Sequence, residues 1–407
     1  MISYLEALLL LEQNAELLPT EVINTQQSLE RIISSDLYSP INLPSFDNSA
    51  MDGFALKYAE TLDAAPDNPL LFLVNDVIAA GVQLPTVAAS AGCSEIMTGA
   101  AIPLGYDAVI PLELVEEINL QGNRYIQLTR EVSQFANIRF SGEDVKSGTL
   151  VLRAGLQIKP CEIMLLSALG IATIKVFKPL GIAIASSGNE ISDNYDQALD
   201  PGEIYNSNSP LLVNLANIKC FAPRYAGILH DNSEALTSFI QQNTEQVLIT
   251  TGAVSKGKWD FIPETLCQLG AEIIFHGVAI RPGKPILFAR LQDGRFFLGL
   301  PGNPLSSMVG WRFFAIPLFY AMWAKQREIP LRLKLKNNFK KSHKLRQFLK
   351  AEMCIEEAVA YARIANGQES FKIKSLSAAN LWVVVAEDDT QFESGDFINV
   401  VPLYPNI

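Results

Sequence analysis

The fold is decided by Gln246-Val247-Leu248-Ile249-Thr250-Thr251-Gly252-Ala253-Val254-Ser255-Lys256-Gly257-Lys258-Trp259-Asp260. The apolar run at its start predicts a buried strand, and residues 261–269 predict a helix. The loop between them contains glycine and two lysines, and the helix that follows adds partial positive charge. We therefore expect a seat for a phosphate or another oxyanion, although an ordinary strand–helix connection has the same pattern. Trp259 stands where the phosphate loop of nucleotide hydrolases needs a magnesium-binding hydroxyl, so that assignment is rejected.

Residues 179–328 continue this alternation of apolar strands and helices. Strands are predicted at 182–185, 224–228, 247–251 and 296–300, and helices at 209–217, 233–241, 263–269 and 305–324. The alternation predicts a mostly parallel sheet covered on both faces. Ligands of such sheets bind beyond the carboxyl ends of the strands.

The flanking segments have a different texture. Residues 1–40, including Ser28 to Ile33, carry apolar side chains at helical spacing, and residues 160–169 predict another helix. Short β-like runs separated by turns predict a β-rich insertion, and the regular short strands near the end predict a small β-barrel or sandwich. We therefore expect four domains, at 1–45 with 139–178, 46–138, 179–328 and 329–407.

Charge and cysteine content exclude several classes of function. The net charge of −11 would repel DNA or RNA. None of the five cysteines forms a C-x-x-C pair, which indicates reduced thiols in a cytoplasm rather than disulfides or a zinc site. The three histidines are far apart, so any metal would be held by carboxylates, which suggests magnesium. The apolar stretch 305–324 contains Arg312 and Pro317, which predicts a buried or interface helix and not a membrane span.

Polar loops are expected to meet on one rim of the sheet. They are residues 186–190, the loop of residues 251–260, and residues 299–306, where Pro301 and Pro304 flank Gly302-Asn303. A fourth element, Arg281-Pro282-Gly283-Lys284-Pro285, brackets a turn with two cations, which predicts a clamp for an oxyanion. Each element alone has a plainer interpretation as a stiff turn, so the prediction depends on their convergence.

Acids in loops complete the pattern. They are Asp52, Asp144, Glu190, Asp231 and Asp260. Carboxylates can face phosphates only when a cation lies between them, and magnesium prefers that arrangement. A single loop aspartate is otherwise usually a turn or helix cap.

Taken together, these stretches resemble molybdopterin molybdenumtransferase, the MoeA and gephyrin E-domain family, over essentially the whole chain. The strings that carry the resemblance are Phe46-Asp47-Asn48-Ser49-Ala50-Met51-Asp52-Gly53, Ile96-Met97-Thr98-Gly99-Ala100, Asn137-Ile138-Arg139, Gly142-Glu143-Asp144, Gly202-Glu203-Ile204-Tyr205-Asn206-Ser207-Asn208, Thr251-Gly252-Ala253-Val254-Ser255, Arg281-Pro282-Gly283-Lys284-Pro285 and Gly299-Leu300-Pro301-Gly302-Asn303-Pro304.

The resemblance implies an α/β multidomain fold. Its parts would be an N-terminal helical domain interrupted by an elongated β-rich insertion, an α/β molybdopterin-binding domain with a mostly parallel sheet, and a C-terminal β-barrel. It also implies a cytoplasmic homodimer whose active site is completed across the interface, with the molybdopterin adenylyltransferase as a further partner. The implied reaction inserts molybdate into adenylylated molybdopterin and releases AMP, with Mg²⁺ assisting. Neither nucleic acid nor a membrane is implied.

The same motifs supply candidate site residues. The catalytic candidates are Asp52, Glu190, Asp231, Asp260 and Lys284, of which Glu190, Asp231 and Asp260 would hold the metal. The candidates for binding the cofactor are Thr98, Arg139, Asp144, Ser187, Gly252, Ser255, Arg281, Pro301, Asn303 and Pro304. His276 is a further candidate contact for molybdate.

The chain departs from the family pattern at the expected site. The departures are Asn189, Asn206, Ser209, Ala253, Lys256, Lys258, Gly277 and Arg281. Two acids are lost and two lysines gained, which is consistent with a retuned active site. It is equally consistent with a paralogue that binds molybdopterin or serves as a scaffold without transferring metal. Without the resemblance, the residues favour a nucleotide-sugar or phosphate transferase, which does not account for the insertion carrying Asp52.

Overall fold

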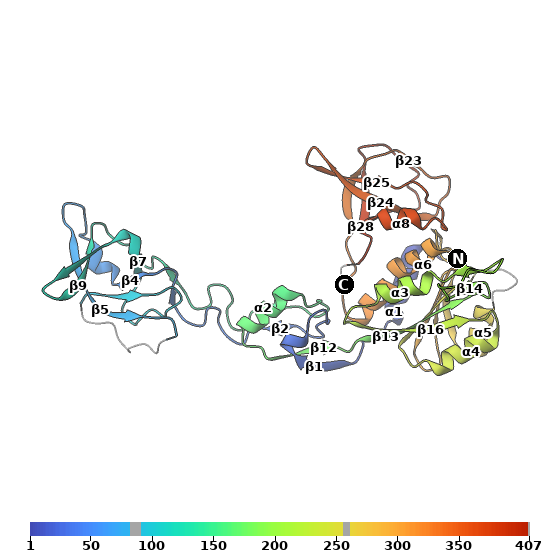
Figure 1. Ribbon diagram of the computed structural model, residues 1–407, viewed down its shortest axis with the longest axis horizontal. Coiled ribbons are helices and arrows are strands. Elements are labelled where there is room, and N and C mark those ends of the chain that lie inside the picture. Colours follow the sequence, from blue (N-terminus) through green and yellow to red (C-terminus); the bar gives the residue numbers. More distant parts are fainter. Residues whose placement is uncertain (82–90, 255–260, 406–407) are drawn as a thin grey trace. The chain divides into compact units, whose positions relative to one another are not determined.

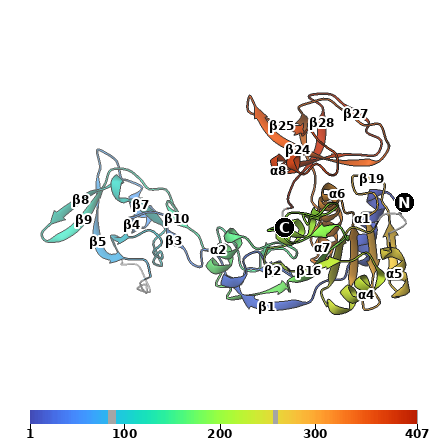
Figure 2. The same ribbon diagram turned by 45° about the vertical axis from the view of Figure 1, so that its right-hand side comes forward.

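The computed structural model describes residues 1–81, 91–254 and 261–405. They form two compact units (Figures 1 and 2). The first unit comprises Met1–Ser35, Ala154–Ile163 and Thr173–Ile407, and the second comprises Asp36–Arg153 and Met164–Ala172. Ser255 and Asp260, together with Lys256, Lys258 and Trp259, lie outside the described residues.

The first unit is organised around a six-stranded sheet that is mostly parallel, as predicted. Its strand order is β16 (Phe221–Leu229), β13 (Leu180–Ser187), β17 (Val247–Thr251), β21 (Phe296–Leu300), β20 (Leu287–Arg290) and β18 (Glu272–His276). The first four strands are parallel, and β20 and β18 join antiparallel at one edge. The carboxyl ends of β13, β17 and β21 therefore lie side by side.

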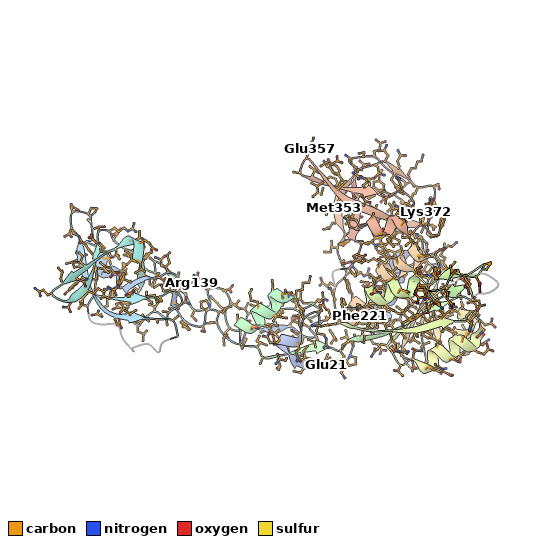
Figure 3. The ribbon with its side chains drawn as sticks, viewed as in Figure 1. Glu21, Arg139, Phe221, Met353, Glu357 and Lys372 are labelled. Atoms are coloured by element: carbon orange, nitrogen blue, oxygen red, sulfur yellow. The ribbon has the colours of Figure 1, made fainter. Side chains whose placement is uncertain are left out.

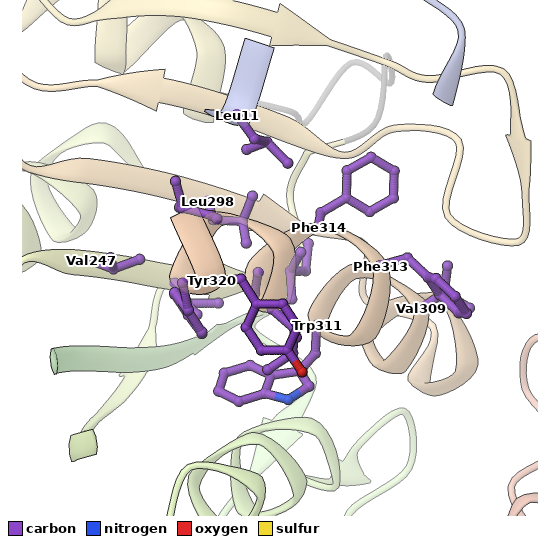
Figure 4. Close-up of a cluster of buried hydrophobic side chains, with 14 of the residues drawn as sticks. Leu11, Val247, Leu298, Val309, Trp311, Phe313, Phe314 and Tyr320 are labelled. Carbon is purple, nitrogen blue, oxygen red and sulfur yellow. The ribbon is translucent and has the colours of Figure 1, made fainter. Parts of the chain in front are cut away.

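Helices cover both faces of this sheet because alternate strand residues point to opposite sides. Val247 and Leu298 face a core formed with α1 (Tyr4–Asn14), α3 (Asn208–Leu215), α6 (Pro304–Gly310) and α7 (Ile316–Met322), which Figure 4 shows. Leu248 and Phe297 face the opposite core, formed with α4 (Ser233–Gln242) and α5 (Ile262–Gln268). Burying each such side chain contributes about 1.5–3 kcal/mol, so the rim loops stand on a rigid base.

The apolar stretch that ends in α7 is a core element. Residues Pro304–Met322 are long and apolar enough to cross a membrane, but 89% of an 18-residue stretch within them is buried inside the protein. Arg312 is 3% exposed, and its guanidinium pairs with the Glu328 carboxylate at 2.5 Å and donates to the Pro402 carbonyl oxygen at 3.2 Å. The expectation of a buried helix is confirmed.

The C-terminal part of the first unit is a closed five-stranded barrel. Its strands are β24 (Arg346–Glu356), β25 (Val359–Ile364), β22 (Leu331–Leu335), β28 (Phe397–Pro402) and β26 (Leu381–Val385), and β26 pairs with β24 to close the barrel. Two elements complete this part, the ladder of β23 (Phe339–Lys340) with β27 (Gln391–Phe392) and the short helix α8 (Lys374–Ala378). The strand β19 (Ile280–Arg281) pairs with β24, so the predicted cation clamp starts on the barrel wall.

The N-terminal segment is less helical than expected. Helix α1 begins with a capping box between Ser3 and Glu6, and β1 (Thr20–Asn24) then pairs with β12 (Thr173–Phe177). The helix predicted around Ser28 to Ile33 is wrong, because Ile32 and Ile33 form bridges to Gln157 and Val176 instead. Both isoleucines are 1% exposed. The free energy gained by burying these two isoleucines against distant segments outweighs the helical preference of a pattern only six residues long.

The second unit contains the β-rich module. Its six-stranded sheet has the order β7 (Ala108–Pro111), β4 (Gly53–Leu56), β6 (Cys93–Ile96), β5 (Leu70–Ile78), β9 (Asn123–Leu128) and β8 (Glu116–Leu120). Two short ladders join the ends of the module's chain, β3 (Asn48–Ser49) with β10 (Ile138–Arg139) and β2 (Leu37–Tyr38) with β11 (Leu150–Leu152). Helix α2 (Pro160–Ala168) follows, as predicted.

Candidate active site

The polar loops do converge at the carboxyl ends of β13, β17 and β21. They line a cavity of about 680 Å³. Among its lining residues are the predicted Ser187, Glu190, Asp231, Gly252, Asn303 and Pro304. The convergence follows from the parallel order of the three strands, because each chain leaves the sheet at the same edge.

Glycines allow the loop backbones to approach closely. Gly252 has a φ of +104°, and a Cβ built there would lie 2.2 Å from the Ser187 carbonyl oxygen. Gly188 is less constrained, since a Cβ there would meet only the Glu190 carboxylate, at 2.6 Å, and that side chain can move away. Ala253, where the family pattern has glycine, also has positive φ, +52°. The floor of the cavity is thus built from backbone that favours glycine.

Two carboxylates stand on one side of this cavity. The Ser187 hydroxyl donates to the Asp231 carboxylate at 3.0 Å. The Asn189 side-chain oxygen accepts from the Asp231 backbone N–H at 3.3 Å and lies 3.3 Å from His230 Nδ1. Asn189 therefore fixes the turn that carries Asp231, although it no longer supplies charge.

The carboxylates that line this cavity are oxygen ligands, which suit a hard cation. Glu190 and Asp231 line one cavity, and magnesium is commonly bound by one or two carboxylates together with substrate phosphates. No three His, Cys, Asp or Glu side chains gather as a metal site among residues 1–81, 91–254 and 261–405. The predicted third acid, Asp260, is outside those ranges.

The predicted cation clamp lines a second cavity, of about 580 Å³. Arg281 and Lys284 both line it, and neither forms an ion pair with an acid in the described ranges. Burial and the positive charge of Arg281 lower the pKa of nearby His343. The His276 ring nitrogen Nε2 lies 2.8 Å from the Val254 carbonyl oxygen, so it holds the loop after β17 and does not line this cavity.

The two cavities are neighbours. Both are lined by Ala253, Gly302, Asn303 and Phe371. Pro301 lines the cationic cavity and Pro304 the acidic one, and the Ser307 hydroxyl donates to the Pro301 carbonyl oxygen at 2.5 Å. A single ligand with an acidic end can therefore extend from one cavity into the other.

Sequence reasoning missed the barrel's contribution to the cleft. Gln347, Gln368, Ser370 and Phe371 line the cationic cavity, and Phe371 also lines the acidic one. No local pattern marks these residues, because they reach the cleft only when the barrel packs beside the clamp. Asn208, by contrast, is part of a motif that the sequence shows, and it is 7% exposed and lines the acidic cavity.

Asn206 and Ser209, two departures from the family pattern, occupy one buried network. The Ser186 hydroxyl donates to the Asn206 side-chain oxygen at 2.9 Å and lies 2.7 Å from the Ser209 hydroxyl. The Asn206 amide nitrogen donates to the Asp193 carboxylate at 2.8 Å and to the Tyr225 hydroxyl at 3.0 Å. An amide is the group that satisfies donors and acceptors on both sides at once.

In the second unit, the candidate residues Asp52 and Thr98 contact each other. The Asp52 carboxylate accepts from the Thr98 backbone N–H at 2.7 Å and from its hydroxyl at 2.8 Å. These bonds hold the pKa of Asp52 below its usual value. Arg139 donates to the Ala50 carbonyl oxygen at 3.4 Å, and Asp144 is exposed on the segment that follows.

Comparison with known proteins agrees with this architecture. Three family models match consecutive parts of the chain: the MoeA N-terminal region (domain I and II) at residues 2–170, a probable molybdopterin binding domain at 183–321, and the MoeA C-terminal region (domain IV) at 332–403. Together they span nearly the full length.

Individual relatives that align over most of their length point to the same family. The molybdopterin molybdenumtransferase of Synechococcus elongatus is 34% identical over 98% of this chain and 99% of its own, and that of Bacillus subtilis is 31% identical over 94% and 89%. The crystal structure of the molybdopterin biosynthesis MoeA protein from Pyrococcus horikoshii superposes with a TM-score of 0.83, at 26% identity, over 98% of this chain and 99% of that one. By sequence and by fold, the chain belongs to the MoeA family of molybdopterin biosynthesis proteins.

Proposed function

We propose that this protein inserts molybdate into adenylylated molybdopterin, with release of AMP, in molybdenum cofactor biosynthesis. The observation that carries the proposal is the pair of adjoining cavities, one cationic and one acidic, which share Ala253, Gly302, Asn303 and Phe371. The relatives named molybdopterin molybdenumtransferase support the same chemistry. A ligand with a phosphate-rich end and a metal-accepting end suits such a divided cleft.

The cationic cavity is the proposed molybdate site. Arg281 offers a planar set of donors and Lys284 a compact positive charge, and both lack ion-pair partners within the described part of the chain. A tetrahedral dianion would neutralise the two charges. We propose Lys284 as the main electrostatic contact and Arg281 as the group that orients the oxyanion.

The acidic cavity is the proposed place of the substrate's phosphates and of Mg²⁺. Glu190 and Asp231 would hold the ion, and Ser187 fixes the Asp231 carboxylate through its hydroxyl. When bound, Mg²⁺ would neutralise charge on the phosphoric anhydride that is cleaved. Asp260 and Ser255 are proposed to complete this site from the loop after β17. Gly252 keeps the floor low enough for the phosphates to approach the backbone N–H groups.

We also propose that the active form is a cytoplasmic homodimer in which the second unit of one copy completes the cleft of the other. Asp52 and Thr98 would act there from the predicted β-rich insertion at 46–138, and Arg139 and Asp144 from the segment that follows it. The exposed Phe46, Met51, Phe135 and Phe140 of this unit support a surface that is covered in the assembly. The molybdopterin adenylyltransferase is the proposed supplier of substrate.

Reconstitution with purified components tests the proposal. Protein, adenylylated molybdopterin, molybdate and Mg²⁺ should yield AMP and active cofactor, and omission of Mg²⁺ should abolish both. Lys284→Met and Glu190→Gln should each lower turnover by about 100-fold or more, whereas Glu272→Gln, an exposed acid on β18, should not change it. Full turnover in Lys284→Met would refute the proposed site.

The second candidate is a binding or scaffold paralogue. The departures at Ala253 and Arg281 favour it, because both residues line the cleft, and Asn189 accepts a hydrogen bond from the backbone of the lining residue Asp231. This candidate predicts tight binding of molybdopterin or AMP without turnover at any Mg²⁺ concentration. The same reconstitution, combined with a binding measurement, separates the two.

A further inference from the structure

One loop of the barrel borders every cavity around the cleft. It comprises residues 365–374, from the end of β25 to the first residue of α8. At its centre Phe371 is 66% exposed, an unusual position for a large apolar ring. Phe371 lines the cationic cavity, the acidic cavity and a third cavity of about 790 Å³ on the other side of the loop. Lys372, labelled in Figure 3, marks this loop on the barrel.

The loop is fixed from beneath, so Phe371 is presented by an ordered backbone. The Lys350 side chain is 0% exposed, and its ammonium donates to the Gly367 carbonyl oxygen at 2.7 Å, the Lys372 carbonyl oxygen at 2.9 Å and the Ser375 hydroxyl at 2.7 Å. The Gln368 amide adds bonds with the backbone N–H and carbonyl of Lys350 at 3.0 and 2.8 Å.

A further bond joins the loop to the cleft. The Leu305 backbone N–H donates to the Ser370 carbonyl oxygen at 3.1 Å, at the start of α6. The residue next to Phe371 is therefore tied to the helix that follows Pro301-Gly302-Asn303-Pro304. With Lys350 and Leu305 both bonded to the loop, the backbone that carries Phe371 is held where the two cavities adjoin.

We propose that Phe371 is a stacking platform for the flat heterocycle of the ligand, a pterin or purine ring. This inference rests on the proposed function, since it concerns the same cleft. The cations Arg281 and Lys284 and the carboxylates Glu190 and Asp231 suit the charged ends of the ligand, and neither pair offers an apolar face to the ring between those ends. An exposed aromatic face between them supplies that missing contact, because stacking on a phenyl ring is favourable for any planar heterocycle.

Binding of two flat probes, pterin-6-carboxylate and AMP, tests the platform. Fluorescence quenching and calorimetry would give the dissociation constants for the full-length protein. Phe371→Ala should weaken binding of at least one probe by about 5- to 30-fold, Phe371→Leu should weaken it nearly as much, and Phe371→Trp should retain it. Phe397→Ala is the matched control, because Phe397 is 53% exposed on β28 and lies over Arg332 outside these cavities.

The outcomes separate this inference from the proposed function. Equal binding of both probes by wild type and Phe371→Ala would overturn the platform, whatever the turnover assay gives. Failure of wild type to bind either probe would also overturn it. Weakened binding in Phe371→Ala without turnover in the wild type would keep the platform and reject the transferase activity.

Discussion

The side-chain amide of Asn208 donates from Nδ2 to the Gly302 carbonyl oxygen at 2.7 Å. This bond joins the start of α3 to the loop between β21 and α6, two segments almost 100 residues apart in the sequence. The side-chain oxygen of Asn208 is buried and has no partner among the described residues. The Asn208 side chain thus donates to the wall of the cleft, and its oxygen atom stays available as an acceptor.

Replacing Asn208 should uncouple these two segments. Asn208→Ala removes the donor and leaves the Gly302 carbonyl unpaired, at a cost of about 1–2 kcal/mol in the free energy of unfolding. Asn208→Asp should cost more, because a buried carboxylate would face that carbonyl oxygen without a donor between them. Urea unfolding of both variants measures the difference. A stability of Asn208→Ala equal to that of the wild type would show that the bond to Gly302 is unimportant.

Gly252→Ala should disturb the site in two ways, through the positive φ of residue 252 and through a steric clash of the added Cβ. Its φ of +104° costs about 1–2 kcal/mol for any side chain, and the added Cβ would lie 2.2 Å from the Ser187 carbonyl oxygen. The end of β13 or β17 would have to move, which should abolish binding of AMP.

Gly294→Ala is the control for this prediction. Gly294 also has positive φ, +89°, but nothing lies within 4 Å of a Cβ there. Calorimetric binding and thermal unfolding should show a modest loss of stability with unchanged AMP affinity. If Gly294→Ala weakened AMP binding as much as Gly252→Ala, the close approach to Ser187 would not be the cause.

Thr98→Val should raise the pKa of Asp52. The Thr98 backbone N–H is the larger cause of the lowered pKa and remains in the variant, but the hydroxyl bond is lost. Because the folded pKa is depressed, the stability that Asp52 contributes is present above its unfolded pKa and is lost as the pH falls through its folded pKa. In Thr98→Val this loss should begin at a higher pH.

An NMR titration of the Asp52 carboxyl carbon measures that change directly. Thr129→Val, at an exposed threonine of the same unit, should leave the Asp52 titration unaltered. An unchanged Asp52 pKa in Thr98→Val would mean that the hydroxyl bond at 2.8 Å has no energetic effect.

Lys350→Met should loosen the loop of residues 365–374. The variant removes three hydrogen bonds from a buried ammonium and leaves the Gly367 and Lys372 carbonyl oxygens with the Ser375 hydroxyl, at a cost of about 2–4 kcal/mol. Lys341→Met is a matched control, since Lys341 is 5% exposed and also donates to three oxygens, the carbonyls of Leu345, Ala386 and Glu387. Hydrogen exchange of amides 366–373 should speed up only in Lys350→Met. Faster exchange in both variants would point to a general loss of stability.

Much of the fold could be predicted because its signals are local. The strand at 247–251 and the helix at 233–241 follow from runs of side chains whose spacing matches their burial. The pattern around Ile32 and Ile33 failed for the opposite reason. Two adjacent isoleucines fit a helix or a bridge equally well, and the choice was made by Gln157 and Val176, far away in the sequence.

The residues of the site likewise fall into two groups, those that local sequence patterns predict and those that they do not. Ser187, Glu190, Gly252 and Asn303 lie at or after the ends of strands whose parallel order could be anticipated, so their convergence could be anticipated as well. Gln368 and Phe371 could not be found, since nothing local links a barrel loop to a cleft. Asn208 carried a signal in its motif, but its bond to Gly302 is visible only in three dimensions.

The pairing of β19 with β24 limits how this protein can be divided into modules. The barrel supplies the partner strand for Ile280-Arg281, and its loop supplies one wall of both cavities. A gene truncated near residue 330 would encode an intact parallel sheet with a misplaced clamp and an open-sided cleft. Recombination that exchanged barrels between relatives would therefore have to bring matching clamp sequences with them, and the two segments are expected to evolve as one inherited block.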